Sequence, residues 1–257
     1  MSRLLALILA CRFGVKFSGE FNYTLSSCCL FFIPQRSTRP NKVHIYGPDF
    51  STFVRSVMLI CEELGVTYTT GFSANGKAIE FKSDEHFKLH PYGKLPILLH
   101  GELVLPETTS ICRYLQENFS DTKTHWTSAQ LAAEHDAFCA IIALYIDKAI
   151  VRDYLLEFVF PKGENKQVRM DVVQSNRLAL QRALEIIEVE INRGKLLGTD
   201  KFTIADALVM PMLQYLTTLP AEVNCLEGFN AIKNYVERSM QRASCKKVLK
   251  SDNKPIA

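Results

Sequence analysis

Two short segments hold residues that could bind an anion, and both stand where a helix is expected to begin. Ser51 and Thr52 directly precede an amphipathic helical pattern over residues 53–64, and Glu107 and Thr108 precede a second one. The first N–H groups of a helix have no partner inside it, and the helix dipole favours negative charge there. A nearby hydroxyl can cap the helix or add a hydrogen-bond donor for an anionic group, and both uses are compatible with these residues.

A third segment places two prolines and a lysine directly before an apolar run. It reads His90-Pro91-Tyr92-Gly93-Lys94-Leu95-Pro96. Two apolar runs, residues 97–99 and 103–105, follow it and flank a His-Gly-Glu turn. This pattern predicts a β-hairpin, so we expect the segment to lead into a strand.

The patterns over residues 42–119 predict a small mixed sheet. Strands are expected over 43–46, 66–70, 97–99 and 103–105, and helices over 53–64 and from the Thr108 region to about 119. Residues 71–89 are polar or charged and predict loop or irregular helix. The order is strand–helix–strand, an irregular segment, then strand–strand–helix, and the helices must cover the sheet.

After a polar linker over residues 120–127, the patterns are nearly all helical. Helices are predicted over residues 128–160, 164–192, 207–216, 229–240 and 244–249. Thr203 and Asp206 have the spacing of a capping box before the third of these helices, so we interpret them as structural.

Together these features resemble the glutathione transferase family over roughly residues 42–250. Residues 90–96 are similar to its N-P-x-G-[KQ]-V-P segment, with His90 in place of the usual Asn, and Glu107-Thr108 is similar to its Glu-Ser pair. Residues 198–206 resemble its G-x-x-[ST]-[IV]-A-D motif. The resemblance implies an α/β N-terminal thioredoxin-like domain over 42–120, which binds glutathione, and an all-α C-terminal domain over 128–257.

The resemblance assigns glutathione contacts to individual residues. In the family, the proline before the third strand follows a cis bond, which exposes the preceding backbone to the cysteinyl part of glutathione; here these residues are Leu95 and Pro96. Thr108 and its helix would hold the γ-glutamyl carboxylate, and Glu107 the ammonium group.

Two lysines are implied for the glycyl carboxylate of glutathione. Lys82 matches the lysine of a His-Lys pair found in the phi and theta classes, although Phe81 stands where the family has the histidine. Lys94 is the second candidate. The electrophile would bind between the domains, against helix residues somewhere between 138 and 154.

The resemblance also implies a catalytic serine. A Tyr-Gly-x-x-x-Ser pattern, with Arg55 four residues after Ser51, is similar to the serine-type classes and gives Arg55 a structural role. A free thiol has a pKa of about 8.5, and lowering it by about two units requires about 2.7 kcal/mol of selective thiolate stabilisation. The Ser51 hydroxyl and the following helix N-terminus could supply this. Thr52 and Tyr46 stay open as alternative donors.

Composition excludes other classes of protein. The net charge is +3 with both signs interspersed, which argues against a nucleic-acid partner. No apolar run approaches the roughly 18 residues of a membrane span. The eight cysteines form no CxxC pair and have no histidine at ligand spacing, so we expect no metal. We interpret Cys61, Cys112 and Cys139 as small apolar residues on helix faces. Because the cysteine pattern does not indicate a disulfide framework, we expect a cytoplasmic protein.

Residues 1–41 differ from the rest of the chain. They contain two apolar runs, 4–10 and 28–33, flanked by arginines. We interpret them as a disordered extension or a start-site artefact, with a short signal peptide as the alternative.

Three functions are compatible with these residues. The first is conjugation of glutathione to small electrophilic apolar compounds, by a protein that the resemblance implies is a homodimer. The second is glutathione-dependent reduction of peroxides or disulfides at the same site. The third is a non-enzymatic interaction module, since a fold alone does not establish activity.

Overall fold

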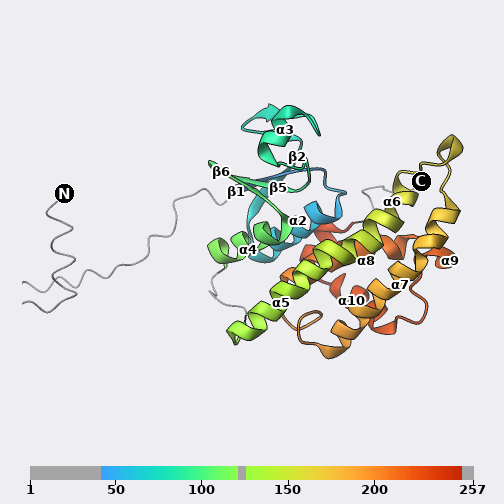
Figure 1. Cartoon of the computed structure of the whole chain (residues 1–257). Coiled ribbons are helices and arrows are strands. Elements are labelled where there is room, and N and C mark those ends of the chain that lie inside the picture. Colours follow the sequence, from blue (N-terminus) through green and yellow to red (C-terminus); the bar gives the residue numbers. More distant parts are fainter. Residues whose placement is uncertain (1–41, 121–125, 251–257) are drawn as a thin grey trace, which may run out of the picture. The chain divides into compact units, whose positions relative to one another are not determined.

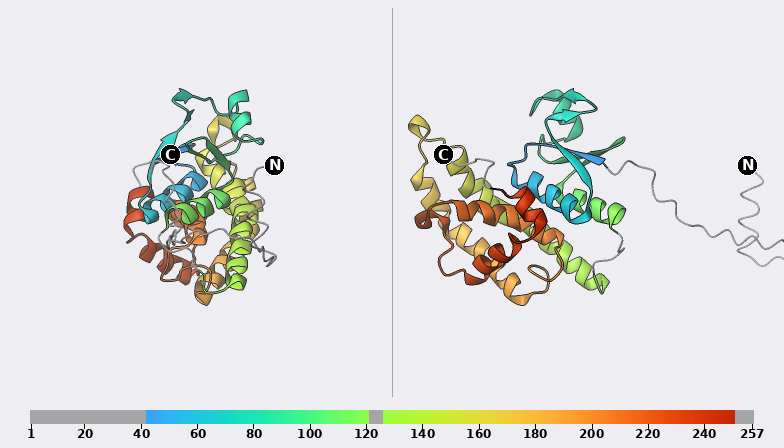
Figure 2. Two further views of the ribbon diagram at one scale, coloured as in Figure 1. Left: turned by 90° about the vertical axis from the view of Figure 1, so that its left-hand side faces the viewer. Right: turned by 180° about the vertical axis from the view of Figure 1, so that it is seen from behind.

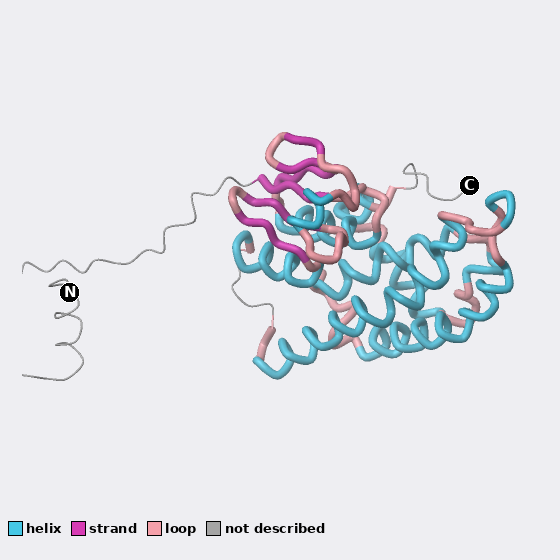
Figure 3. Tube along the Cα trace, turned by 45° about the horizontal axis from the view of Figure 1, so that its top comes forward, coloured by secondary structure: helices cyan, strands magenta, loops and turns pink. Residues whose placement is uncertain are grey.

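A four-stranded mixed sheet occupies one end of the described chain (Figures 1 and 3). The computed structural model describes residues 42–120 and 126–250, so the extension predicted over 1–41 and most of the predicted linker lie outside the described residues. The strands are β1 (Lys42–Tyr46), β2 (Thr67–Gly71), β5 (Ile97–His100) and β6 (Leu103–Pro106), in the order β2-β1-β5-β6. β1 is parallel to β2 and antiparallel to β5, and β5 pairs with β6 as the predicted hairpin.

Helices α2 (Thr52–Leu64) and α4 (Thr108–Phe119) lie on one side of this sheet, between it and the later helices (Figures 1 and 2). α2 ends at Gly65, whose φ of 65° suits glycine and whose N–H donates to the carbonyls of Cys61 and Glu62. The region predicted as loop or irregular helix contains a small hairpin, β3 (Ser73–Ala74) and β4 (Lys77–Ala78), and the short helix α3 (Asp84–Leu89).

The helix predicted over 128–160 is present as one long continuous helix, here called the rod, and its middle section is π-helical. α5 (Ala129–Ile141) continues into the π-helical segments η1 (Ile142–Ile146) and η2 (Lys148–Leu155) and then into α6 (Leu156–Val159). π-Helical winding is rare and is often found at functional sites. The periodicity of the sequence did not indicate it.

The predicted start of the next helix at residue 164 is wrong. α7 is Met170–Arg193, and residues Glu164–Lys166 form a separate 3₁₀ turn, η3. Asn165 and Lys166 have φ values of 53° and 60°, which end any right-handed helix there. The remaining helices are α8 (Ile204–Thr218), α9 (Ala221–Asn224), α10 (Asn230–Ser239) and α11 (Ala243–Val248). In the described part of the chain no helix is long and apolar enough to cross a membrane.

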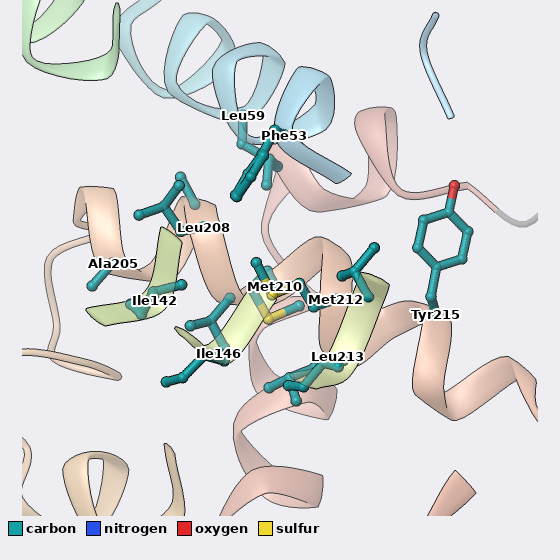
Figure 4. Close-up of a cluster of buried hydrophobic side chains, with 14 of the residues drawn as sticks. Phe53, Leu59, Ile142, Ile146, Ala205, Leu208, Met210, Met212, Leu213 and Tyr215 are labelled. Atoms are coloured by element: carbon teal, nitrogen blue, oxygen red, sulfur yellow. The ribbon is translucent and has the colours of Figure 1, made fainter. Parts of the chain in front are cut away.

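One hydrophobic core joins the two halves of the chain. Every residue of α8 from Ile204 to Leu216 is buried, as expected of a helix that is apolar on all sides. Figure 4 shows Phe53 and Leu59 of α2 on one side of this core, and Ile142 and Ile146 of η1 beside α8. α8 therefore packs against both α2 of the sheet-bearing half and η1 of the long rod.

Asp206 anchors the start of α8. Its buried carboxylate accepts hydrogen bonds from the Thr203 N–H at 2.8 Å, the Thr203 hydroxyl at 2.7 Å, the Gly198 N–H at 3.0 Å and the Tyr235 hydroxyl at 2.8 Å. The predicted capping box is confirmed, since the Thr203 hydroxyl also accepts from the Asp206 N–H. Asp206 thus fixes both the preceding loop and α10 on α8.

We predict that Asp206→Ala lowers the free energy of unfolding by roughly 3 kcal/mol or more, because it leaves several buried donors without an acceptor. Urea unfolding followed by circular dichroism measures the change. Asp200→Ala, an exposed carboxylate in the preceding loop, is the matched control. Equal unfolding midpoints for the two variants would contradict the anchoring role of Asp206.

The cysteines of the described chain are free thiols in the interior. Cys61, Cys112 and Cys139 are buried, which confirms their interpretation as apolar residues. Burial raises the pKa of Cys61 and of Cys139 to about 12. These thiols are therefore protonated and unreactive at neutral pH, because the thiolate is the nucleophile.

We predict that native protein at pH 8 protects Cys61 and Cys139 from iodoacetamide, while urea-unfolded protein is alkylated at both. Peptide mass spectrometry resolves each cysteine separately. The unfolded thiol ionises near its ordinary pKa of 9.0 while the folded thiol stays protonated, so stability should also fall as the pH rises from about 9 toward about 12. Alkylation of native protein at the rate of free glutathione would contradict this.

Candidate functional site

A cavity of about 510 Å³ lies where the segment before β5, the start of α4 and the π-helical rod meet. Five of the predicted glutathione-binding residues line it: Lys94, Leu95, Pro96, Glu107 and Thr108. The opposite wall includes residues 143, 144, 147, 148, 152 and 153, inside the range predicted for the electrophile site. Among the described residues, no group of three or more acidic, histidine or cysteine side chains could hold a metal ion.

The peptide bond between Leu95 and Pro96 is cis, as predicted. Pro96 is buried and leads directly into β5. Leu95 also approaches the loop after β1 at Gly47, which has a φ of 144°. A Cβ atom on residue 47 would lie only 2.7 Å from Val54 Cγ2 and 3.6 Å from Leu95 Cδ2. A glycine is therefore required at position 47 by its positive φ and by its close packing against Val54 of α2, whereas the distance to Leu95 is an ordinary contact.

The start of α4 offers free donors to the cavity. Glu107 has φ 71° and ψ 114°, an unusual backbone conformation for a residue other than glycine. No side chain caps the helix and its first turn holds no acidic residue, so its first N–H groups are available. Thr108 is buried, whereas the Glu107 side chain is 70% exposed and free to reach a ligand.

His90, which replaces the family's asparagine, orders the segment between these elements. Its ring is buried, and Nδ1 accepts a hydrogen bond from the Tyr92 N–H at 3.1 Å. The neutral ring must then carry its proton on Nε2, which lies 3.6 Å from Glu107 Oε1. His90 thus contacts both the segment before β5, at Tyr92, and the residue before α4, Glu107.

A second histidine, for which the sequence indicated no role, fixes the backbone of Lys94. His86 of α3 accepts from the Lys82 N–H at Nδ1 (3.0 Å), and its Nε2 donates to the Lys94 carbonyl at 3.1 Å. Burial lowers the pKa of His86, so the ring is neutral at physiological pH and can make both bonds. A lone histidine in a charged segment gives no sequence signal for this role.

The two candidate lysines differ in position. Lys94 lines the cavity. Lys82 is exposed, is not among the lining residues, and its ammonium lies 5.5 Å from the centre of the Phe81 ring.

Ser51 is the residue immediately before α2. Its N–H donates to the Pro48 carbonyl at 3.1 Å and its carbonyl accepts from the Arg55 N–H at 2.9 Å. Its half-buried hydroxyl makes no hydrogen bond with any described residue. Ser51 itself is not among the cavity-lining residues, but Phe53, in the first turn of α2, is.

The two alternative hydroxyls are less accessible than Ser51. Thr52 is only 7% exposed. Tyr46 is fully buried, donates to the Ile79 carbonyl at 3.2 Å, and packs edge-on against the Phe72 ring and at a tilt against the His86 ring. Burial raises the pKa of Tyr46, which disfavours its ionisation.

Arg55 braces the loop that carries Ser51 and is structural, as expected. Its Nε donates to the Asp49 carbonyl at 2.8 Å and Nη1 to Gln214 Oε1 at 3.4 Å. Its guanidinium lies 4.7 Å from the centre of the Tyr215 ring, and the Tyr215 hydroxyl donates to the Phe50 carbonyl at 2.6 Å. Gln214 and Tyr215, the partners of Arg55 on α8, were not predicted, because the apolar helical pattern around them indicates only a buried helix.

Both halves of the chain are similar to known proteins. The family model of the glutathione S-transferase N-terminal domain matches residues 50–118, and that of the C-terminal domain matches residues 149–243. The rice protein named "Probable glutathione S-transferase GSTF1" is 26% identical over 209 residues, which cover 80% of this chain and 94% of the relative.

Solved structures show the same fold. Poplar glutathione transferase F2 aligns with a TM-score of 0.68 at 24% identity, over 80% of this chain and 97% of the other. Maize glutathione S-transferase I, in complex with an atrazine glutathione conjugate, aligns with a TM-score of 0.66 at 25% identity, over 80% and 95%. Since both domain models match in order and together span more than half of the sequence, the chain belongs to the glutathione S-transferase family.

Proposed function

We propose that this protein is an enzyme that conjugates the glutathione thiolate to small electrophilic apolar compounds. The observation that carries the proposal is the convergence of Lys94, the Leu95-Pro96 pair and the Glu107-Thr108 pair on one cavity. Phe53 joins this cavity to the helix start that carries Ser51. We assign the glutathione-binding role to residues 42–120 and the electrophile wall to the helical part, 128–257.

In this proposal each end of glutathione has a complementary group. The γ-glutamyl carboxylate accepts from the α4 N-terminus and Thr108, and Glu107 pairs with the ammonium. The backbone of Leu95 pairs with the cysteinyl unit, and Lys94 takes the glycyl carboxylate. Lys94 is better placed for this than Lys82, which stays outside the cavity wall.

Ser51 is the proposed thiolate stabiliser. Its hydroxyl is unpaired among the described residues and adjoins the N-terminus of α2, whose dipole also favours an anion. The thiolate then attacks the electrophilic carbon, a C–S bond forms, and a leaving group departs or the adduct takes up a proton. Holding both reactants in one cavity supplies the rest of the acceleration.

We predict that Ser51→Ala raises the pKa of bound glutathione by about two units and lowers kcat/KM for 1-chloro-2,4-dinitrobenzene about 50-fold at pH 6.5, because the thiolate fraction falls from about one half to about one hundredth. The thiolate absorbance of the binary complex and the pH profile of the rate measure the two effects. Tyr46→Phe is the comparison variant, because it keeps the ring and removes only the hydroxyl of the alternative donor Tyr46, which is buried.

Full activity of Ser51→Ala would transfer the role to Thr52 or Tyr46, and a loss of activity in Tyr46→Phe would single out Tyr46. Turnover of a hydroperoxide without turnover of the chloronitrobenzene would support the reductase alternative. Glutathione binding with neither reaction would support the non-enzymatic alternative.

We further propose a cytoplasmic location, which fits the free thiols of the described chain, because glutathione keeps cytosolic thiols reduced. We also propose a homodimer, as the family resemblance implies. Large exposed side chains near the cavity suit such an interface: Tyr92 is 78% exposed, Leu144 63% and Tyr145 68%.

We predict that sedimentation equilibrium gives twice the chain mass of 29.1 kDa. Tyr145→Glu should weaken association by placing a charge in a buried contact. Leu178→Glu on α7 is the control, since Leu178 is similarly exposed at 77%. A single 29.1 kDa species at micromolar concentration would contradict the dimer.

A further inference from the structure

The electrophile wall of the cavity includes Arg152, whose side chain is oriented by an ion pair with a buried carboxylate. Arg152 of η2 donates from Nε to Asp147 Oδ2 at 2.8 Å. The Asp147 side chain is only 5% exposed, whereas that of Arg152 is 46% exposed. Both residues line the cavity. The buried carboxylate therefore fixes the guanidinium at the cavity wall.

The contact to Asp147 uses only one nitrogen of the guanidinium. Neither terminal nitrogen of Arg152 makes a hydrogen bond with a residue in the described ranges. The guanidinium carbon lies 5.9 Å from the centre of the Phe53 ring, which also lines the cavity. Two N–H₂ groups are thus available beside the start of α2, in the planar arrangement that matches a carboxylate.

The π-helical winding creates this arrangement. Asp147 and Arg152 are five residues apart, and so are Lys148 and Asp153, which form a second ion pair at the same cavity. In an α-helix, residues three or four apart are neighbours, whereas the i→i+5 bonds of a π-helix bring residues five apart together. The second pair compensates the charge of Asp153. Arg152 is also paired, but its pair with Asp147 leaves both terminal N–H₂ groups unused, and Lys94 forms no ion pair with a described residue. We therefore take Arg152 and Lys94 as the cations of the described lining that can receive an anion.

We propose that Arg152, oriented by Asp147 and Phe53, binds the carboxylate of an acidic electrophile and thereby selects such substrates. This inference rests on the conjugation proposed above and adds a substrate class to it. The ligand has an electrophilic carbon on an apolar frame and a carboxylate near it. In a conjugate addition, the glutathione sulfur bonds to one alkene carbon, the π electrons move to the carbon beside the carbonyl, and that carbon takes a proton from water.

The same guanidinium could instead contact the glycyl carboxylate of glutathione, and the test separates the two sources. Monomethyl fumarate carries one carboxylate, and dimethyl fumarate is its neutral counterpart. The ratio of kcat/KM for the acid to that for the diester cancels effects that the two substrates share. We expect Arg152→Gln to lower this ratio roughly tenfold, with the KM for glutathione changed much less.

Three further variants complete the design. Arg152→Lys keeps the charge without the planar fork and should retain part of the preference. Asp147→Asn with Arg152→Gln keeps the pair neutral and guards against misfolding from an unpaired buried carboxylate. Arg182→Gln on α7, an exposed cation outside the cavity wall, is the control and should leave the ratio unchanged.

Binding of the two preformed glutathione adducts, measured by calorimetry, decides the proposal without turnover. The parent should bind the acid adduct more tightly than its methyl ester, and Arg152→Gln should remove that difference. An unchanged ratio and unchanged adduct preference would overturn the proposal. A rise confined to the KM for glutathione would assign Arg152 to glutathione instead. If the parent protein does not conjugate the chloronitrobenzene, that result contradicts the proposed function but not the role of Arg152, since adduct binding tests Arg152 separately.

Discussion

The loop that carries Ser51 is held by a buried cation, and the rest of the site is built around that loop. Arg55 lies at the interior of the molecule, with the Asp49 carbonyl on one side and Gln214 and Tyr215 of α8 on the other. Burial lowers the pKa of Arg55, because the charged guanidinium loses its hydration in the interior. Because an unpaired buried charge is strongly destabilising, the loop and α8 must keep their relative positions.

This constraint connects local sequence to the cavity. The apolar packing of α2 on α8 places Phe53 beside Arg152 of the π-helical section, while Gly47 allows the loop after β1 to pack closely against Val54 of α2. The cavity is therefore formed by the segment before β5, the start of α4 and the π-helical section, with Phe53 of α2 beside them. His86 fixes the first of these segments by its bond to the Lys94 carbonyl, and ion pairs five residues apart order the π-helical wall.

The sequence allowed most of the fold to be predicted, because its elements have strong local signals. Gly65 marks the end of α2, and the hairpin follows from apolar runs around a turn. The start of α7 was predicted wrongly because the polar residues 164–166 continue an amphipathic pattern, while Asn165 and Lys166 adopt positive φ values. Side-chain pattern does not report such backbone reversals.

The candidate site was predictable where it depends on motifs and not where it depends on packing between distant segments. The residues before β5 and at the start of α4 occupy fixed places in a motif, and they converge on the cavity. His86, Asp147 and Arg152 have no such signal, since their partners are set by the winding and packing of helices. The role of Ser51 in catalysis and the division into domains stay predictions.

The π-helical section has a consequence for how this protein can vary. A helix wound with i→i+5 bonds holds more residues per turn than its α-helical neighbours. Removing one residue of this section outside residues 148–151 would let it tighten to α-helical winding, and would turn Asp147 and Arg152, still five residues apart, away from each other. Insertions and deletions in this helix, which are ordinarily regarded as events of loops, would therefore change which side chains meet at the cavity.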